Sequence, residues 1–214
     1  MVQTVLAYGD SNTHGTAPMR DVLDRHRYGP DERWCGHAAA VLGDGVRFIE
    51  EGLPGRTTVF DDPIEGEHKN GRTMLLGILE THRPLDAVVL MLGTNDLKAR
   101  FGAPAADIAG GVERLARIVA QSGVGPNGGA PPMLIVAPPP IEEIGWIGAG
   151  FAGGRARSLG LGAAMAAMAV RAGADFLDAG AHVTVSAIDG IHYERETHAV
   201  LGRAIATALS KVLK

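Results

Sequence analysis

Five short apolar runs divide the 214-residue chain, and a stretch compatible with a helix follows each of them. The runs are residues 2–8, 46–49, 87–92, 133–137 and 174–177. The third and fourth runs are apolar at every position, which is typical of strands that helices cover on both faces. This alternation predicts an α/β fold built on a five-stranded parallel sheet, with the third and fourth strands near its middle.

The segments between the runs carry helical patterns. In residues 112–119 apolar side chains recur at i, i+3, i+4 and i+7, and residues 201–212 repeat the pattern at the end of the chain. Residues 163–170 are rich in Ala and Met, which predicts a helix that packs closely against the sheet. The first and third of these three helices follow predicted strands inside the chain, and the helix at 201–212 ends it.

The length suits one domain, and we expect residues 1–214 to form a single one. No internal repeat is visible. The segments 123–132 and 138–154 are rich in Gly and Pro, but periodic elements resume after each of them. We therefore interpret both segments as loops within that domain.

Charge, uncharged stretches and cysteine content indicate which partners and which compartment to expect. The chain has 20 Lys and Arg against 24 Asp and Glu, interspersed along the sequence, so no basic face for nucleic acid is expected. Its uncharged stretches are broken by Gly and Pro or too short to span a membrane. The first predicted strand begins directly after Met1, without a secretory pattern, and a lone Cys35 cannot form an internal disulfide. These features predict a cytoplasmic protein.

Residues able to carry chemistry follow the predicted strands. Ligands of open parallel sheets bind beyond the carboxyl ends of the strands. Ser11 follows the first strand, Gly55 the second and Asn95 the third, while Asp189 and His192 come after the fifth. The sequence therefore gathers a hydroxyl, an amide and an imidazole with a carboxylate at one edge of the sheet.

Asp189 and His192 can supply the base and the carboxylate that a serine nucleophile needs. A serine hydroxyl reacts poorly until a base takes its proton, and an acceptor must hold that base by its other nitrogen. A separation of three residues lets one turn supply both groups. His182 is a competing base, but no carboxylate stands three residues before it.

The remaining candidates are donors for a negatively charged oxygen. The side-chain amide of Asn95 and the backbone N–H groups of Ser11 and Gly55 can donate to an oxyanion, and one such donor is worth roughly 10²–10³ in turnover. Taken singly, each candidate fits an ordinary role better. Ser11 could cap a helix, Asn95 and Gly55 could form turns, and His192 could be a surface histidine. Only the combination points to catalysis.

In this order, Ser11, Gly55, Asn95 and His192 resemble the four residues that name the SGNH (GDSL-type) hydrolase family. The resemblance covers nearly the whole chain, and the phrases at 91–96 and 189–192 are similar to those of bacterial arylesterases and acyltransferases within that family. It implies a flavodoxin-like three-layer α/β/α sandwich, a Ser11–His192–Asp189 triad, and no metal or cofactor.

The same resemblance implies a small-molecule substrate. It implies hydrolysis of short-chain acyl or aryl esters through an acyl-enzyme, with acyl transfer to alcohols or deacetylation of sugars in some members, and assembly as a homo-oligomer. Asn12 replaces the family's Leu and His14 the subgroup's usual Trp, which predicts a more polar wall beside the nucleophile. We expect Asn12, Ile191 and Phe151 to contact substrate, and the loop 141–151 either to line the pocket or to anchor itself or a subunit interface.

Two other functions compete with this interpretation. Asp10, Asn95, Asp96 and His192 could be ligands of a metal-dependent phosphoesterase, but no His-x-His or similar motif accompanies them. A non-catalytic, flavodoxin-like module could bind a small ligand at the same edge. Against that alternative, the first turn lacks the glycine-rich phosphate-binding patterns.

Overall fold

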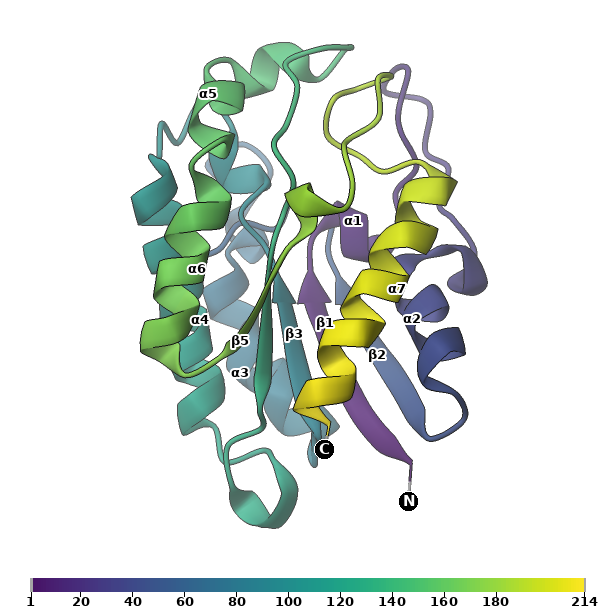
Figure 1. The fold of residues 1–214 in the computed structure, drawn as a ribbon. Coiled ribbons are helices and arrows are strands. Elements are labelled where there is room, and N and C mark those ends of the chain that lie inside the picture. The colour runs from purple at the N-terminus through teal and green to yellow at the C-terminus, as the bar shows by residue number, and fades with distance from the viewer. Residues whose placement is uncertain (1, 214) are drawn as a thin grey trace.

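The computed structural model describes residues 2–213 and contains one five-stranded parallel sheet. Its strands are β1 (Gln3–Gly9), β2 (Val46–Gly52), β3 (Ala87–Met91), β4 (Met133–Ala137) and β5 (Asp175–Asp178). They lie in the order β2-β1-β3-β4-β5, the order of the flavodoxin-like fold (Figure 1). The predicted fold class is confirmed, and β3 and β4, buried along their whole length, both lie inside the sheet.

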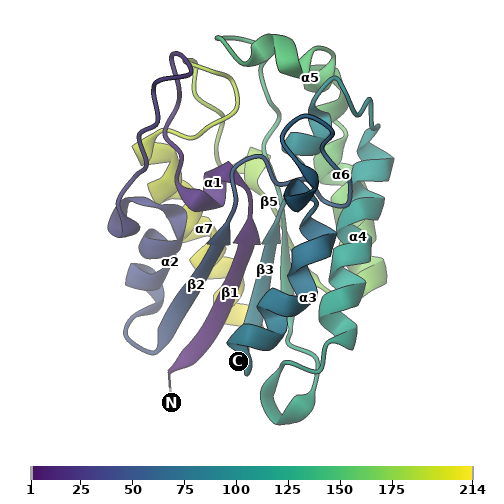
Figure 2. The same cartoon turned by 180° about the vertical axis from the view of Figure 1, so that it is seen from behind.

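Helices cover both faces of the sheet (Figures 1 and 2). They are α1 (Ser11–His14), α2 (Trp34–Leu42), α3 (Gly71–His82), α4 (Ala105–Gln121), α5 (Gly154–Ser158), α6 (Leu161–Ala172) and α7 (Arg195–Val212). Helices α3, α4 and α6 pack on one face, and α2 and α7 pack on the other. Successive side chains of β1 alternate between the two cores: Leu6 and Tyr8 enter the first, Val5 and Ala7 the second. The predicted helices correspond to α4, α6 and α7.

The largest difference from the predicted strand bounds is in the second strand, while the bounds of β1, β3 and β5 differ by one residue. We expected the second strand to end at residue 49, where the apolar run stops, but β2 continues to Gly52. Its last three residues pair with Ala7, Tyr8 and Gly9 of β1, so backbone pairing extends the strand past its apolar residues. Because β2 is an edge strand, Arg47 is exposed and Glu50 and Glu51 are only partly buried.

All five strands end at the same edge of the sheet, where α1 and the long loops gather (Figure 1). Residues 138–153 form mostly loop there, with one short 3-10 turn at Gly148–Phe151. No helix within residues 2–213 combines the length and apolar character needed to cross a membrane.

Candidate active site

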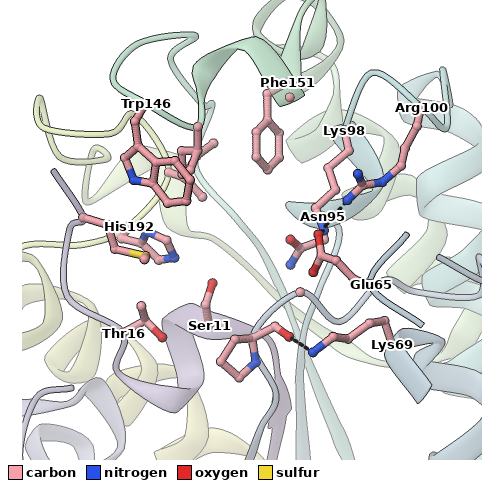
Figure 3. Close-up of a pocket in the computed structure, with 16 residues that line it drawn as sticks. Ser11, Thr16, Glu65, Lys69, Asn95, Lys98, Arg100, Trp146, Phe151 and His192 are labelled. Carbon is pink, nitrogen blue, oxygen red and sulfur yellow. Dashed lines mark hydrogen bonds and ion pairs between the residues drawn. The ribbon is translucent and has the colours of Figure 1, made fainter. Parts of the chain in front are cut away.

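The first strand-to-helix turn presents Ser11 at this edge. Asp10 caps α1, since its carboxylate accepts a hydrogen bond from the Asn12 N–H at 2.9 Å. The capping role therefore belongs to Asp10 and not to Ser11. The turn also depends on Gly9, where a Cβ atom would lie 2.1 Å from Thr13 Oγ1. Ser11 lines a cavity of about 520 Å³, and Figure 3 shows its hydroxyl pointing into that space.

Asp189 and His192 form the second part of the site. The His192 Nδ1 atom lies 2.7 Å from Asp189 Oδ2, while Asp189 Oδ1 accepts the N–H groups of Ile191 at 3.0 Å and His192 at 2.9 Å. The Met19 N–H donates to Asp189 Oδ2 at 2.8 Å. Burial alone would raise the pKa of Asp189, but the hydrogen bonds and charge of His192 hold it below the usual value. An ionised Asp189 keeps the proton on His192 Nδ1, which leaves Nε2 as the basic nitrogen.

The fold brings Ser11 and His192 to one cavity from opposite ends of the chain. Both line it, and Figure 3 shows the His192 ring beside the Ser11 hydroxyl. Within residues 2–213 the Ser11 hydroxyl and the His192 ring are not joined by a hydrogen bond. Contacts of this type often tighten only when substrate binds. The competing base His182 lines a separate surface hollow and not this cavity.

Gly55 and Asn95 lie at the same cavity. Gly55 occupies a tight turn in which the Arg56 N–H donates to the Leu53 carbonyl at 3.0 Å, and its φ of 83° is one that favours glycine. Asn95 is buried, and its Nδ2 donates to the Arg56 carbonyl at 3.1 Å. An amide nitrogen carries two hydrogens, so this contact leaves one for another acceptor.

Asp96 and Arg56 are buried and hold this turn in place, a role that the sequence did not predict; the sequence suggested Asp96 only as a possible metal ligand. Asp96 is fully buried, and both its carboxylate oxygens accept the Thr58 N–H, at 3.0 and 3.1 Å. Burial raises the pKa of Asp96 to about 6, although the Thr58 contacts act in the opposite direction. Arg56 donates to the carbonyl of Gly9 at 2.8 Å, and its guanidinium stacks on the Tyr8 ring at 4.0 Å. Each partner is distant in sequence, so no local spacing could reveal these contacts.

The predicted substrate contacts divide into two groups. Ile191 and Phe151 line the cavity, as does Trp146 from the loop predicted to border it. Asn12 does not line it, because its side chain is buried and donates to the Ile191 carbonyl at 3.2 Å. His14 does not line it either; its Nδ1 lies 3.1 Å from Thr16 Oγ1. The structure therefore does not place the expected polar wall at Asn12 and His14.

The polar wall lies across the cavity instead. Figure 3 shows Trp146 and Phe151 on one side and Glu65, Lys98 and Arg100 on another. Lys98 and Arg100 are both ion-paired with Glu65 and Asp62; the Arg100–Asp62 distance is 3.0 Å. The cavity thus combines an aromatic surface with charged groups that can bind hydroxyls.

The alternative metal site has no ligand set in the described part of the chain. Among residues 2–213, no three His, Cys, Asp or Glu side chains converge as a metal ion would require. Asp96 is engaged by Thr58, and Asp10 by the cap of α1. The metal-dependent phosphoesterase is therefore not supported.

Comparison with known proteins agrees with this geometry. Residues 7–200 match the model of the GDSL-like Lipase/Acylhydrolase family. The inhibitor-bound aryl esterase of M. smegmatis is 38% identical with a TM-score of 0.94, over 99% of this chain and 100% of that one. Est24, a carbohydrate acetylesterase from Sinorhizobium meliloti, is 40% identical with a TM-score of 0.93, over 98% and 99% of the two chains. A search of curated protein sequences finds no match.

Proposed function

Because the chain belongs to the GDSL-like lipase/acylhydrolase family and is a serine ester hydrolase, we propose specific roles for the residues around its cavity. Ser11 is the nucleophile, His192 the general base, and Asp189 the group that orients and stabilises the imidazolium. The observation that carries this assignment is the 2.7 Å contact between Asp189 and His192, on a ring that borders the same cavity as Ser11.

The proposed reaction follows from these positions. Ser11 Oγ attacks the ester carbonyl carbon while His192 Nε2 accepts its proton. The backbone N–H groups of Ser11 and Gly55 and the Nδ2 of Asn95 stabilise the negative oxygen. When the tetrahedral adduct collapses, the leaving alcohol takes the proton from His192 and an acyl-enzyme remains. Water, activated by the same histidine, then attacks the acyl carbon and releases the acid.

We propose short-chain acyl and aryl esters, including acetylated sugars, as substrates. The aromatic surface of Trp146 and Phe151 suits an aryl group, and the ion-paired wall of Lys98 and Arg100 offers donors to sugar hydroxyls. The similar solved structures include an aryl esterase and a carbohydrate acetylesterase. An alcohol in the place of the leaving group would accept the acyl group instead of water, so we also propose acyl transfer. No nucleic acid, membrane, metal or cofactor takes part in this scheme.

The test is hydrolysis of p-nitrophenyl acetate by wild type and Ser11→Ala. The variant should lose turnover, the initial burst of nitrophenolate, and labelling by a fluorophosphonate. Wild-type turnover in Ser11→Ala would overturn the assignment. A panel of acetyl, butyryl and longer esters and acetylated sugars, with and without added alcohol, would then define the substrate and the share of acyl transfer.

We also propose that residues 1–214 act as one domain in a cytoplasmic homo-oligomer. The single Cys35 is buried as a free thiol, which suits a reducing compartment. Trp146 and Leu159 keep 44% and 62% of their surface exposed, and such apolar side chains are candidates for an interface between copies. Light scattering of the purified protein tests the assembly, since the mass of a single chain would contradict it.

A further inference from the structure

Lys69 differs from the other cations of the cavity. Lys98 and Arg100 are paired with carboxylates, but Lys69 forms no salt bridge within residues 2–213. Its Nζ atom donates instead to the backbone carbonyl of Pro54 at 2.8 Å, the contact drawn beside Lys69 in Figure 3.

The Pro54 carbonyl and the Gly55 N–H belong to one peptide group. A trans peptide is planar, and its carbonyl and N–H point in opposite directions. A hydrogen bond that fixes the carbonyl therefore also fixes the direction of the N–H. Because the Gly55 N–H is the proposed oxyanion donor, Lys69 orients that donor from behind.

The turn geometry allows this peptide two orientations. The Arg56-to-Leu53 hydrogen bond and the φ of 83° at Gly55 define a type II turn with Pro54 and Gly55 at its centre. Types I and II differ by a flip of the central peptide, and glycine accepts the φ values of both. The flip would turn the Gly55 N–H away and present the Pro54 carbonyl oxygen to the substrate.

Lys69 is held where it can prevent that flip. The backbone carbonyl of Lys69 accepts a hydrogen bond from the Thr57 N–H at 2.9 Å. This bond fixes the Lys69 backbone beside the turn, because Thr57 is only two residues after Gly55. Its stem packs on the turn, since a Cβ atom on Gly55 would lie 3.3 Å from Lys69 Cε. A charge-assisted hydrogen bond is roughly twice as strong as a neutral one, and it polarises the peptide so that the N–H becomes a better donor.

We propose that Lys69 is a positioning residue for the oxyanion site, holding the Pro54–Gly55 peptide in its donating orientation through the Pro54 carbonyl. The inference rests on the proposed role of the Gly55 N–H. It extends that role to a residue that touches neither the nucleophile nor the base.

The test compares Lys69→Met, which keeps the length of the stem but loses the donor, with Lys69→Arg, which keeps a cationic donor. With p-nitrophenyl acetate, Lys69→Met should lower kcat about 10- to 100-fold at a nearly constant KM, somewhat less than the loss of a whole oxyanion donor. Lys69→Arg should stay within a few-fold of wild type. Inhibition by a boronic acid that forms a tetrahedral adduct on Ser11 should weaken in Lys69→Met by a factor similar to the fall in kcat.

Arg72→Met is the matched control, because Arg72 is an exposed cation near Lys69 in sequence that does not line the cavity. Its kcat should equal that of wild type. A wild-type kcat in Lys69→Met, a raised KM with unchanged kcat, or equal losses in Lys69→Met and Lys69→Arg would each overturn the proposal. If Lys69→Met does not fold, Lys69→Ala, which likewise carries no donor, replaces it, and a wild-type kcat there would overturn the proposal equally. Turnover retained in Ser11→Ala would instead reject the proposed function, so the two failures are distinguishable.

Discussion

The two sides of the cavity are held in place by different kinds of contact. On the base side, Asp189 accepts hydrogen bonds from Ile191 and His192, two and three residues further along, and one distant bond from Met19. On the oxyanion side, the turn at residues 53–58 is held from distant segments. Asn95 binds the Arg56 carbonyl and Asp96 binds Thr58. The base side is thus a largely self-contained turn with a few distant contacts, while the oxyanion side depends on the assembled fold.

The pKa values of the buried carboxylates on the two sides are shifted in opposite directions. Asp189 and Asp96 are both fully buried, and burial is the largest influence on each. At Asp189 the facing His192 ring and several N–H donors outweigh burial and lower the pKa. At Asp96 the Thr58 contacts do not outweigh it, nearby Asp10 adds negative charge, and the pKa rises to about 6. The two pKa shifts differ in direction because Asp189 faces His192, which can become a cation, whereas Asp96 faces the neutral Thr58.

The base side is tested most severely by Asp189→Asn. An amide can still accept the neighbouring N–H groups, but its NH₂ can donate to His192 Nδ1 and so favour the tautomer that carries the proton on Nε2. That tautomer cannot take the Ser11 proton, and we expect kcat to fall by about 10⁴. Steady-state kinetics with p-nitrophenyl acetate measure the effect, and circular dichroism checks the fold. A loss below tenfold would mean that Asp189 does not set the tautomer.

The oxyanion side is tested directly by Asn95→Ala. Removing one oxyanion donor should lower kcat by roughly 10²–10³ with a smaller change in KM, because the negative charge on the oxygen is absent from the bound ester and develops as the transition state forms. The variant also frees the Arg56 carbonyl, so the thermal unfolding midpoint should be recorded with the kinetics. An unchanged kcat in the folded variant would remove Asn95 from the oxyanion site.

These differences explain which parts of the fold and of the site could be predicted from the sequence. The alternation of apolar runs predicts the parallel sheet, and the three-residue spacing of Asp189 and His192 predicts a turn that supplies both groups. The contacts of Asp96 with Thr58 and of Arg56 with Gly9 join residues with no common local pattern, so only the folded chain reveals them. Asn12 illustrates the opposite error. Its position next to Ser11 suggested a cavity wall, but the helical turn directs its side chain toward Ile191.

The opposite pKa directions give a test of stability against pH. Because Asp96 has a folded pKa of about 6, above its reference value of 3.8, the folded protein binds this proton more tightly than the unfolded chain does. The cost of burying the charge is complete above pH 6 and diminishes as pH falls toward 3.8. Relative to Asp96→Asn, wild type should therefore gain about 2 kcal/mol in its free energy of unfolding between pH 7.5 and pH 4.5.

Urea titrations at pH 7.5 and pH 4.5 measure this gain, and in the same titrations Asp189→Asn should show the reverse trend. Its carboxylate has a folded pKa below the unfolded value, so its contribution to stability is present above the unfolded pKa and is lost as pH falls through the folded one. Wild type should consequently lose stability relative to Asp189→Asn as the solution is acidified. The same direction in both variants would contradict the distinction between the two carboxylates.

Asn12→Ala should have the smallest effect, and it tests whether Asn12 couples the nucleophile turn to the base side. Asn12 links them by its bond to the Ile191 carbonyl, but its own Oδ1 is buried without a hydrogen-bond partner in the described chain. Truncation removes a bond worth about 1 kcal/mol and also removes that unpaired oxygen, so the net loss of stability should stay below about 1 kcal/mol. Since the contacts of Asp189 hold the His192 turn without Asn12, kcat should change less than about threefold. A tenfold fall in kcat with an unchanged unfolding midpoint would show that His192 is positioned through Asn12, and that the base side is not self-contained.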